Sequence, residues 1–342
     1  MRFYLKVGLF FLHKKITVVG KENIPKKGAI LFIGNHQNAL IDAILIPTTT
    51  KRKIHFLTRA SAFSTKLITK FLKSLNLIPV YRIRDGIGTI ERNLAVFEQC
   101  FEILNNEGAV EVFAEGAHHL KRQILPLKKG FARIILGTLK KYPTLEIQIV
   151  PIGINYDSHL NFPSSVSIHY GKPILANNFI NVENPDIRFM AIKNEVNSAL
   201  KKLTLHIEDD ANYDEIISKL NSANVDYTNP AETTKLMQNL KSSSTKQVTN
   251  NKVNWLLPIH LITKLNSIFP LLIWQYLKST ITDIVFTNTY RFALIMTVFP
   301  LFYVVQTAII FYFFNINYAL IYFASSILFG IISSKTMPIN LK

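Results

Sequence analysis

The feature that most constrains the fold is an apolar region near the C-terminus of this 342-residue chain. Residues Phe292–Phe314 run for 23 positions without a charged side chain, which is long enough to cross a bilayer as a helix. A second uncharged run, Tyr318–Ser334, follows a short polar turn. Together they predict a helical membrane hairpin over residues 291–342. Their lengths disfavour the alternative, a helix pair buried in a soluble core.

Positive charges flanking the hairpin predict its orientation. Arg291 precedes it, and Lys335 and Lys342 follow it. By the positive-inside rule both ends face the cytoplasm, together with the domain that precedes them. Within residues 254–290, the apolar stretch Trp255–Tyr276 is broken by two prolines and a lysine, so we expect interfacial or re-entrant helices there. The protein is therefore expected to be a multi-pass membrane protein.

The basic charge is concentrated in the first part of the chain. Residues 1–203 carry 29 Lys and Arg against 14 Asp and Glu, whereas residues 204–342 carry 10 against 8. A basic domain joined to an apolar tail favours an anionic membrane surface and anionic substrates. Nucleic acid is the competing interpretation of the charge, but no nucleic-acid-binding motif is visible and the apolar tail argues against it. The single cysteine, Cys100, excludes an intrachain disulfide.

Residues 1–14 predict a short helix. Its apolar run is too short to span a bilayer and lacks the cleavage site of a signal peptide. Aromatic and basic residues alternate in it, which suits a helix lying in the membrane interface. An ordinary helix packed on the domain fits the same residues equally well.

Residues 15–206 alternate between strand-like and helix-like runs. Five short apolar runs predict strands: Ala29–Ile33, Ile54–Leu57, Leu77–Val80, Ala109–Phe113 and Ile147–Ile154. Helical patterns lie between and after them, at Ile90–Leu104, Phe131–Leu139 and Ile187–Leu205. This alternation predicts an α/β domain with a mixed sheet flanked by helices. Residues 207–253 change character and end in a polar run, 241–251, so we expect a helical and flexible linker.

The first of four polar blocks is GNHQNALID, residues 34–42. A strand ends, a polar turn follows, and an apolar helix begins near Asp42. A neutral histidine at a strand end can take a proton from an alcohol, and a carboxylate on its other ring nitrogen would orient it. His36 and Asp42 are the candidates for these two roles. A surface histidine beside a helix-capping aspartate would give the same pattern.

Three further blocks follow other predicted strands. The second, residues 78–86, contains Arg82 and Arg84, whose guanidinium groups suit a phosphate. The third, residues 112–119, contains Glu115-Gly116 and is followed by Lys128. Its two histidines are adjacent and lack further ligands, so no metal site is expected. The fourth, residues 149–154, could line an acyl groove or belong to the core.

In their order, these blocks resemble the glycerophosphate/lysophosphatidate acyltransferase family, over roughly residues 15–175. The resemblance implies that His36 is the general base and Asp42 its partner. It implies a substrate-binding set composed of Asn35, Arg82, Arg84, Glu115, Gly116 and Lys128. The donor would be acyl-CoA or acyl-carrier protein, and the acceptor glycerol 3-phosphate, dihydroxyacetone phosphate or 1-acylglycerol 3-phosphate. No cofactor and no metal are implied.

The sequence departs from the family pattern at two of the blocks. The family has four residues between His and Asp, whereas five separate His36 from Asp42. Six positions along a helix amount to about 240°, so His36 is expected on a non-helical lead-in that absorbs the extra residue. The longer form resembles fungal glycerol-3-phosphate/dihydroxyacetone-phosphate acyltransferases, which favours an unacylated acceptor. In the third block Ala117-His118-His119 replaces the usual Thr-Arg-Ser, so Lys121, Arg122 or Lys128 would have to contact the phosphate.

Two other functions fit the same sequence. A non-catalytic scaffold of this fold could bind phospholipid through its basic face, and an acyl thioesterase would pass the acyl group to water. All four blocks precede residue 175, so we expect the tail to anchor the protein without taking part in chemistry. A chain ending near Leu240 would then keep the catalytic fold.

Overall fold

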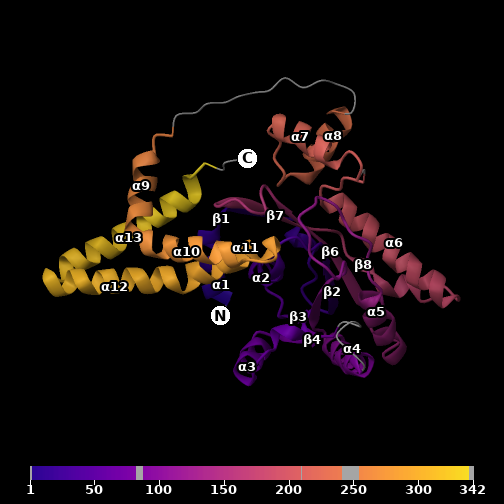
Figure 1. Ribbon diagram of the computed structural model, residues 1–342. Coiled ribbons are helices and arrows are strands. Elements are labelled where there is room, and N and C mark those ends of the chain that lie inside the picture. The colour runs from indigo at the N-terminus through magenta and orange to yellow at the C-terminus, as the bar shows by residue number, and fades with distance from the viewer. Residues whose placement is uncertain (1, 82–87, 209, 241–253, 339–342) are drawn as a thin grey trace.

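The computed structural model describes residues 2–81, 88–208, 210–240 and 254–338 (Figure 1). Its centre is an eight-stranded sheet in the order β1-β7-β6-β2-β5-β3-β4, with β8 paired to β6. Strand β6 is antiparallel to β7 and β8, and the other pairings are parallel. The predicted mixed α/β sheet is therefore confirmed. The strands are β1 (His13–Val19), β2 (Ala29–Gly34), β3 (Ile54–Arg59), β4 (Leu77–Val80), β5 (Ala109–Phe113), β6 (Ile147–Tyr156), β7 (Ser164–Tyr170) and β8 (Ile174–Leu175).

The five predicted strands all form. In four of them, alternate residues enter the two cores on opposite faces of the sheet, whereas Ile78 and Val80 of β4 both enter the same core. Strands β1 and β7 were not predicted, because β1 begins with three polar residues and β7 alternates serine with apolar residues. Both contribute Ile or Val to one core, so their pairing in the sheet decides their structure.

Helices cover both faces of the sheet (Figure 1). One face packs against α4 (Thr89–Asn105), α5 (Gly130–Lys141) and α6 (Pro185–Leu203), which lie close to their predicted positions. The other face packs against α1 (Arg2–Leu12) and α2 (Ala39–Thr49). A shorter helix, α3 (Lys66–Ser74), follows β3.

The region after α6 forms a small cluster of its own. Helices α7 (Tyr213–Ser222) and α8 (Pro230–Leu240) enclose Leu205, Leu220 and Tyr227. The residues predicted as a flexible linker, 241–251, lie outside the described residues. The described chain resumes before α9 (Leu257–Asn266) and α10 (Ile268–Thr280), which are bent by 81° relative to each other. Such a bend is found in a broken span or a re-entrant segment.

The C-terminal helices are the short η5 (Ile284–Phe286), α11 (Thr287–Met296), α12 (Val298–Phe313) and α13 (Ile316–Thr336). Of these, α12 and α13 extend away from the domain (Figure 1). Within the described residues, two stretches are long and apolar enough to cross a membrane: Ile284–Phe313, which joins η5, α11 and α12, and Ile316–Thr336. The side chain of Asn315 caps α13 at the turn between them.

The first of these two stretches begins inside the domain. Phe292 and Met296 of α11 are buried in the same core as Leu9 of α1 and Leu45 of α2. At Gly8 the contact is so close that a Cβ atom would lie 2.1 Å from the Met296 sulfur. The expectation for a chain ending near Leu240 did not include this contribution of α11 to the core, and the folding of such a chain stays a prediction. Removing α11 would expose the core beneath α2, the helix that carries Asp42.

Helix α1 packs on the domain with one side and exposes aromatic residues on the other. It buries Gly8, Leu9 and Leu12 against the domain, while Phe3, Tyr4 and Phe10 remain exposed. The C-terminal helix holds it from outside, because Lys335 donates hydrogen bonds to the carbonyls of Phe10 and His13. Its placement in a membrane interface stays a prediction.

Candidate active site

The first and third polar blocks meet at one edge of the sheet. Strands β2 and β5 are parallel neighbours, with Gly34 opposite Phe113. The residues that follow each strand therefore emerge side by side at the carboxyl ends of the strands, where α/β folds usually place their sites. The backbone N–H of His119 donates to the carbonyl of His36 over 3.3 Å and joins the two loops directly.

His36 and Asp42 form a hydrogen-bonded pair. Nδ1 of His36 lies 2.9 Å from Oδ2 of Asp42. The Asp42 side chain is fully buried, and the same oxygen accepts from the backbone N–H groups of Gln37 and Asn38 at 2.7 and 2.6 Å. Its other oxygen accepts from the Tyr156 hydroxyl at 2.7 Å. The carboxylate therefore has four donors, which compensate the cost of burying its charge.

The longer spacing between His36 and Asp42 is absorbed as expected. Helix α2 begins only at Ala39, and His36 stays on the turn before it. Ala39 has a φ of 40°, a left-handed conformation that costs an L-residue roughly 1–2 kcal/mol. This conformation lets residues 36–38 curl over Asp42, so that two backbone N–H groups and the imidazole reach one carboxylate. Backbone strain of this kind is characteristic of functional sites.

The His36 ring is oriented from several sides. It stacks on Phe113 with 4.1 Å between ring centres and 9° between planes. Because its Nδ1–H donates to Asp42, Nε2 is the nitrogen available to accept a proton. The side chain is 17% exposed, so a substrate hydroxyl can reach it. This arrangement suits a general base.

Tyr156 is a site residue that the sequence analysis did not identify. It lies two positions beyond the fourth block, on the same face of β6 as Ile152 and Ile154. Burial, and then the nearby Asp42 charge, raise the pKa of Tyr156 well above its usual value, so its hydroxyl stays protonated and donates. The alternation along β6 could have placed it near α2, but nothing in the sequence joins it to Asp42.

Glu115 is buried beneath the turn that carries His36. One of its carboxylate oxygens accepts from the N–H of His36 at 3.1 Å. The other lies 2.9 Å from Nε2 of His119 and accepts from the N–H of Leu125 at 3.0 Å. Its observed contacts thus fasten three loop segments around His36. Its predicted contact with substrate stays a prediction.

Gly116 and Lys128 lie against each other at the rim. Gly116 has a φ of +68°, and a Cβ atom there would lie 3.0 Å from Cγ of Lys128. The N–H of Lys128 donates to the carbonyl of Ala114 over 2.7 Å, which places the exposed lysine beside the Glu-Gly turn. A side chain in place of Gly116 would be strained and would displace Lys128.

The three cations considered for phosphate binding differ in their environments. Lys121 forms an ion pair with Asp210 at 2.8 Å. Arg122 is buried, donates to the carbonyls of Tyr156 and Asp157, and lies over the Tyr227 ring. Among these three, and within the described part of the chain, only Lys128 is exposed without an ion pair. It is the best placed of the three to meet an anion.

The remaining predicted substrate ligands are Asn35 and the pair Arg82 and Arg84. Asn35 is fully buried, and its amide exchanges two hydrogen bonds with the backbone of Ile154, at 2.7 and 3.0 Å. In the structure it therefore ties the end of β2 to β6, and its contact with substrate stays a prediction. Arg82 and Arg84 lie outside the described residues. No group of three potential metal ligands occurs in the described ranges.

The C-terminal region also reaches the site, which the sequence did not predict. Nε2 of His118 lies 3.2 Å from a carboxylate oxygen of Asp283, and the His118 ring stands edge-on to that of His36. Asn288 of α11 donates to the carbonyl of His159 over 2.9 Å. Contacts between residues more than 120 positions apart leave no periodic signal in the sequence.

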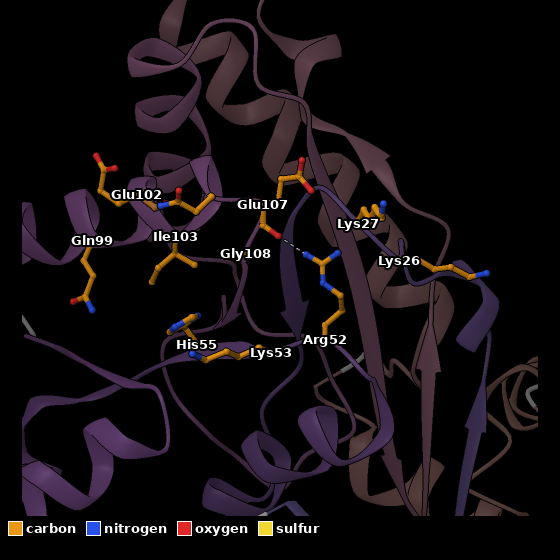
Figure 2. Close-up of a pocket in the computed structure, with 11 residues that line it drawn as sticks. Lys26, Lys27, Arg52, Lys53, His55, Gln99, Glu102, Ile103, Glu107 and Gly108 are labelled. Carbon is orange, nitrogen blue, oxygen red and sulfur yellow. Dashed lines mark hydrogen bonds between the residues drawn. The ribbon is translucent and has the colours of Figure 1, made fainter.

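A cavity lies at the opposite, amino-terminal edge of the strands (Figure 2). It measures about 580 Å³ and is lined by basic residues such as Lys26, Lys27 and Lys53. Arg52 also lines it, but donates to the carbonyls of Pro25, Gly28 and Glu107. This arginine therefore joins three loops, and the cavity is separate from His36.

The part of the chain that carries His36 and Glu115 is similar to known proteins. Residues 15–155 match the family model described as Acyltransferase. Glycerol-3-phosphate O-acyltransferase 2 of Saccharomyces cerevisiae is 35% identical over 83 residues, which are 24% of this chain and 11% of that protein. A probable 1-acyl-sn-glycerol-3-phosphate acyltransferase of Mycoplasma pneumoniae is 29% identical over 157 residues, covering 44% of this chain and 54% of that protein.

One solved structure is also similar: the 1-acyl-sn-glycerophosphate (LPA) acyltransferase PlsC of Thermotoga maritima. It matches with a TM-score of 0.44 and 20% identity, over 60% of this chain and 80% of that one. The matched segments span about a tenth of the yeast relative and about half of the Mycoplasma relative. Over residues 15–155 the chain is thus similar to the acyltransferase family.

Proposed function

We propose that this protein transfers a fatty acyl group from a thioester to a hydroxyl of a glycerol phosphate, with His36 as general base. The observation that carries the proposal is the 2.9 Å bond between His36 and the fully buried Asp42, at the carboxyl ends of parallel strands. The family match supports the reaction class. The donor is acyl-CoA or acyl-carrier protein, and the pathway is phospholipid biosynthesis.

In the proposed reaction Nε2 of His36 takes the proton of the acceptor hydroxyl. The hydroxyl oxygen attacks the thioester carbonyl, and a tetrahedral oxyanion forms. When this intermediate collapses, the carbon–sulfur bond breaks and the imidazolium returns the proton to the leaving thiolate. Asp42 stabilises the imidazolium and fixes the tautomer that presents an unprotonated Nε2. No covalent acyl-enzyme is required.

We propose glycerol 3-phosphate or dihydroxyacetone phosphate as the acceptor, rather than 1-acylglycerol 3-phosphate. The similarity to a protein named glycerol-3-phosphate O-acyltransferase 2 supports this choice. Lys128, exposed at the rim beside Gly116, is the proposed phosphate ligand among the described residues, and Arg82 and Arg84 are proposed to assist it.

The proposed location is a membrane, with the catalytic domain on the cytoplasmic face. The two apolar stretches that end in α12 and α13 support a multi-pass arrangement. Arg291 near the start of the first stretch and Lys335 at the end of the second support the orientation. The lipid bilayer would then receive the acylated product.

The test is an assay of the purified full-length protein with acyl-CoA and three acceptors in parallel. These are glycerol 3-phosphate, dihydroxyacetone phosphate and 1-acylglycerol 3-phosphate. We expect an ester product with one of the first two at the highest kcat/KM. Free fatty acid formed without any acceptor would identify a thioesterase instead. Phospholipid binding without turnover of acyl-CoA or acyl-carrier protein would identify a scaffold.

A further inference from the structure

The ring of His118 is enclosed between the catalytic histidine and the C-terminal region. Its centre lies 5.4 Å from that of His36 and 5.2 Å from that of Phe286, and both pairs are nearly perpendicular. Its Nε2 lies 3.2 Å from Oδ2 of Asp283, and the side chain is 12% exposed. Since a carboxylate only accepts, Nε2 of His118 carries the hydrogen of this bond.

Asp283 is itself held in place. Its Oδ1 accepts from the N–H of Val285 over 3.2 Å and so caps η5. The next helix, α11, is anchored by Phe292 and Met296 in the core beneath α2. Asp283 therefore does not belong to a loose loop, and it presents its second oxygen to His118 from a docked segment.

A second contact joins the same segment to the other member of the catalytic pair. Asn288 holds the carbonyl of His159, whose Nε2 lies 3.0 Å from Oε1 of Gln37. The N–H of Gln37 donates to Asp42. The segment 283–296 is thus connected to the catalytic pair by two chains of contacts. One runs through His118 to His36, and the other through His159 and Gln37 to Asp42.

We propose that Asp283 and His118 are a positioning pair for the general base. Asp283 holds the His118 ring against His36, and His118 restricts rotation of the His36 ring so that Nε2 stays directed at the acceptor hydroxyl. The docked C-terminal segment is then a part of the active site as well as a membrane anchor. This inference rests on the proposed role of His36.

The first test is kcat and KM of Asp283→Ala in the full-length protein. Displacing a catalytic group by a fraction of an ångström costs rate without weakening binding. We expect kcat to fall about tenfold, with the KM for each substrate changed less than about twofold. Asp283→Asn should restore most of the rate, because the amide oxygen can still cap η5 while the amide N–H donates to Nε2 of a neutral His118 in its other tautomer.

The second test is a double-mutant cycle. His118→Ala should lower kcat by a similar factor, and the variant with both substitutions should be no slower than either single variant. Independent, multiplying losses would overturn the pair. An unchanged kcat in Asp283→Ala, or a loss that appears only in KM, would overturn it as well. If Asp283→Ala is not recovered folded, Asp283→Asn and His118→Ala decide the question.

Asn315→Ala is the matched control. Asn315 also caps a helix of the C-terminal region, accepting from the N–H groups of Asn317 and Tyr318 at 3.0 and 3.2 Å. It should leave kcat unchanged, and an equal loss there would mean that helix capping alone explains Asp283. Turnover that persists in His36→Ala contradicts the proposed function itself. Turnover lost in His36→Ala but normal in Asp283→Ala contradicts only the positioning pair.

Discussion

The two ends of the sheet use polar residues in different ways. At the carboxyl ends of the strands, Asp42 gathers four donors so that His36 keeps one ring nitrogen free for chemistry. At the amino ends, Arg52 donates its own hydrogen bonds to three backbone carbonyls, of which the bond to Glu107 is drawn in Figure 2. The first arrangement orients a reactive group, and the second fastens loops. Substitutions at the two ends should therefore separate activity from stability.

After removal of His36 itself, the largest effect on activity is expected for Asp42→Asn. An asparagine can place its amide oxygen where Oδ2 lies and keep the bonds from His36, Gln37 and Asn38, so the fold should survive. The negative charge that stabilises the imidazolium is lost, and we expect kcat to fall about 100-fold or more. Steady-state kinetics on the purified variant check this. A near-normal rate would show that the pair does not operate as a dyad.

Arg52→Ala should have the opposite profile. Three carbonyls lose a charged donor, and we expect the protein to be about 2 kcal/mol less stable. The kcat of the folded fraction should stay within about twofold of the original. Thermal unfolding in detergent, combined with kinetics below the transition, measures both. A selective loss of acceptor binding in this variant would remove the proposed contrast between the two ends.

Glu111 lies midway along β5, between the two ends of the sheet, and its carboxyl group is buried. Neither of its oxygens has a hydrogen-bond partner among the described residues, and burial followed by the Asp42 charge raises its pKa well above 4.5. Folding therefore requires a proton once the pH exceeds the unfolded pKa near 4.5. Stability should fall as pH rises from there toward the folded pKa, by up to about 1.4 kcal/mol per pH unit.

Glu111→Gln removes this proton requirement. The variant should become progressively more stable than the original protein between pH 5 and pH 8, as measured by thermal unfolding. The exposed Glu195→Gln is the matched control and should show no such trend. Parallel stability curves for Glu111→Gln and the original protein would show that Glu111 is ionised in the folded state.

Among the residues that contact Asp42, the smallest effect on activity is expected for Tyr156→Phe. Asp42 loses one donor of four and keeps its bond to His36. Losing a single hydrogen bond of this kind corresponds to roughly 0.5–1.5 kcal/mol, so kcat should fall about two- to twelvefold. A loss as large as that in Asp42→Asn would mean that Tyr156 has a direct role in the reaction.

The sequence predicted the elements of the site better than the connections among them. The strands that precede His36 and Glu115 are apolar runs, and their parallel pairing brings both residues to one edge of the sheet. The lead-in before α2 was predicted because a continuous helix could not bring His36 to Asp42. The left-handed Ala39 that makes this possible has no signature in its own residue type.

Long-range contacts were beyond prediction from one sequence. The docking of α11 through Phe292 and Met296 depends on the shape of the surface formed by α1 and α2. In the sequence, these two residues were indistinguishable from the start of a membrane span. The contact between Asp283 and His118 was also not predictable, because these two polar residues from separate regions meet only after the tail has docked.

The account is tested most directly by comparing acyl transfer in two membrane preparations. One contains the original protein and the other an equal amount of the His36→Ala variant. The substitution leaves Asp42 with three of its four donors and removes the only proposed base. We predict that the rate of acylglycerol phosphate formation falls at least about 1000-fold, while the amount of folded protein is unchanged. Turnover within about tenfold of the original rate would contradict His36 as the general base, and with it the proposed function of this edge of the sheet.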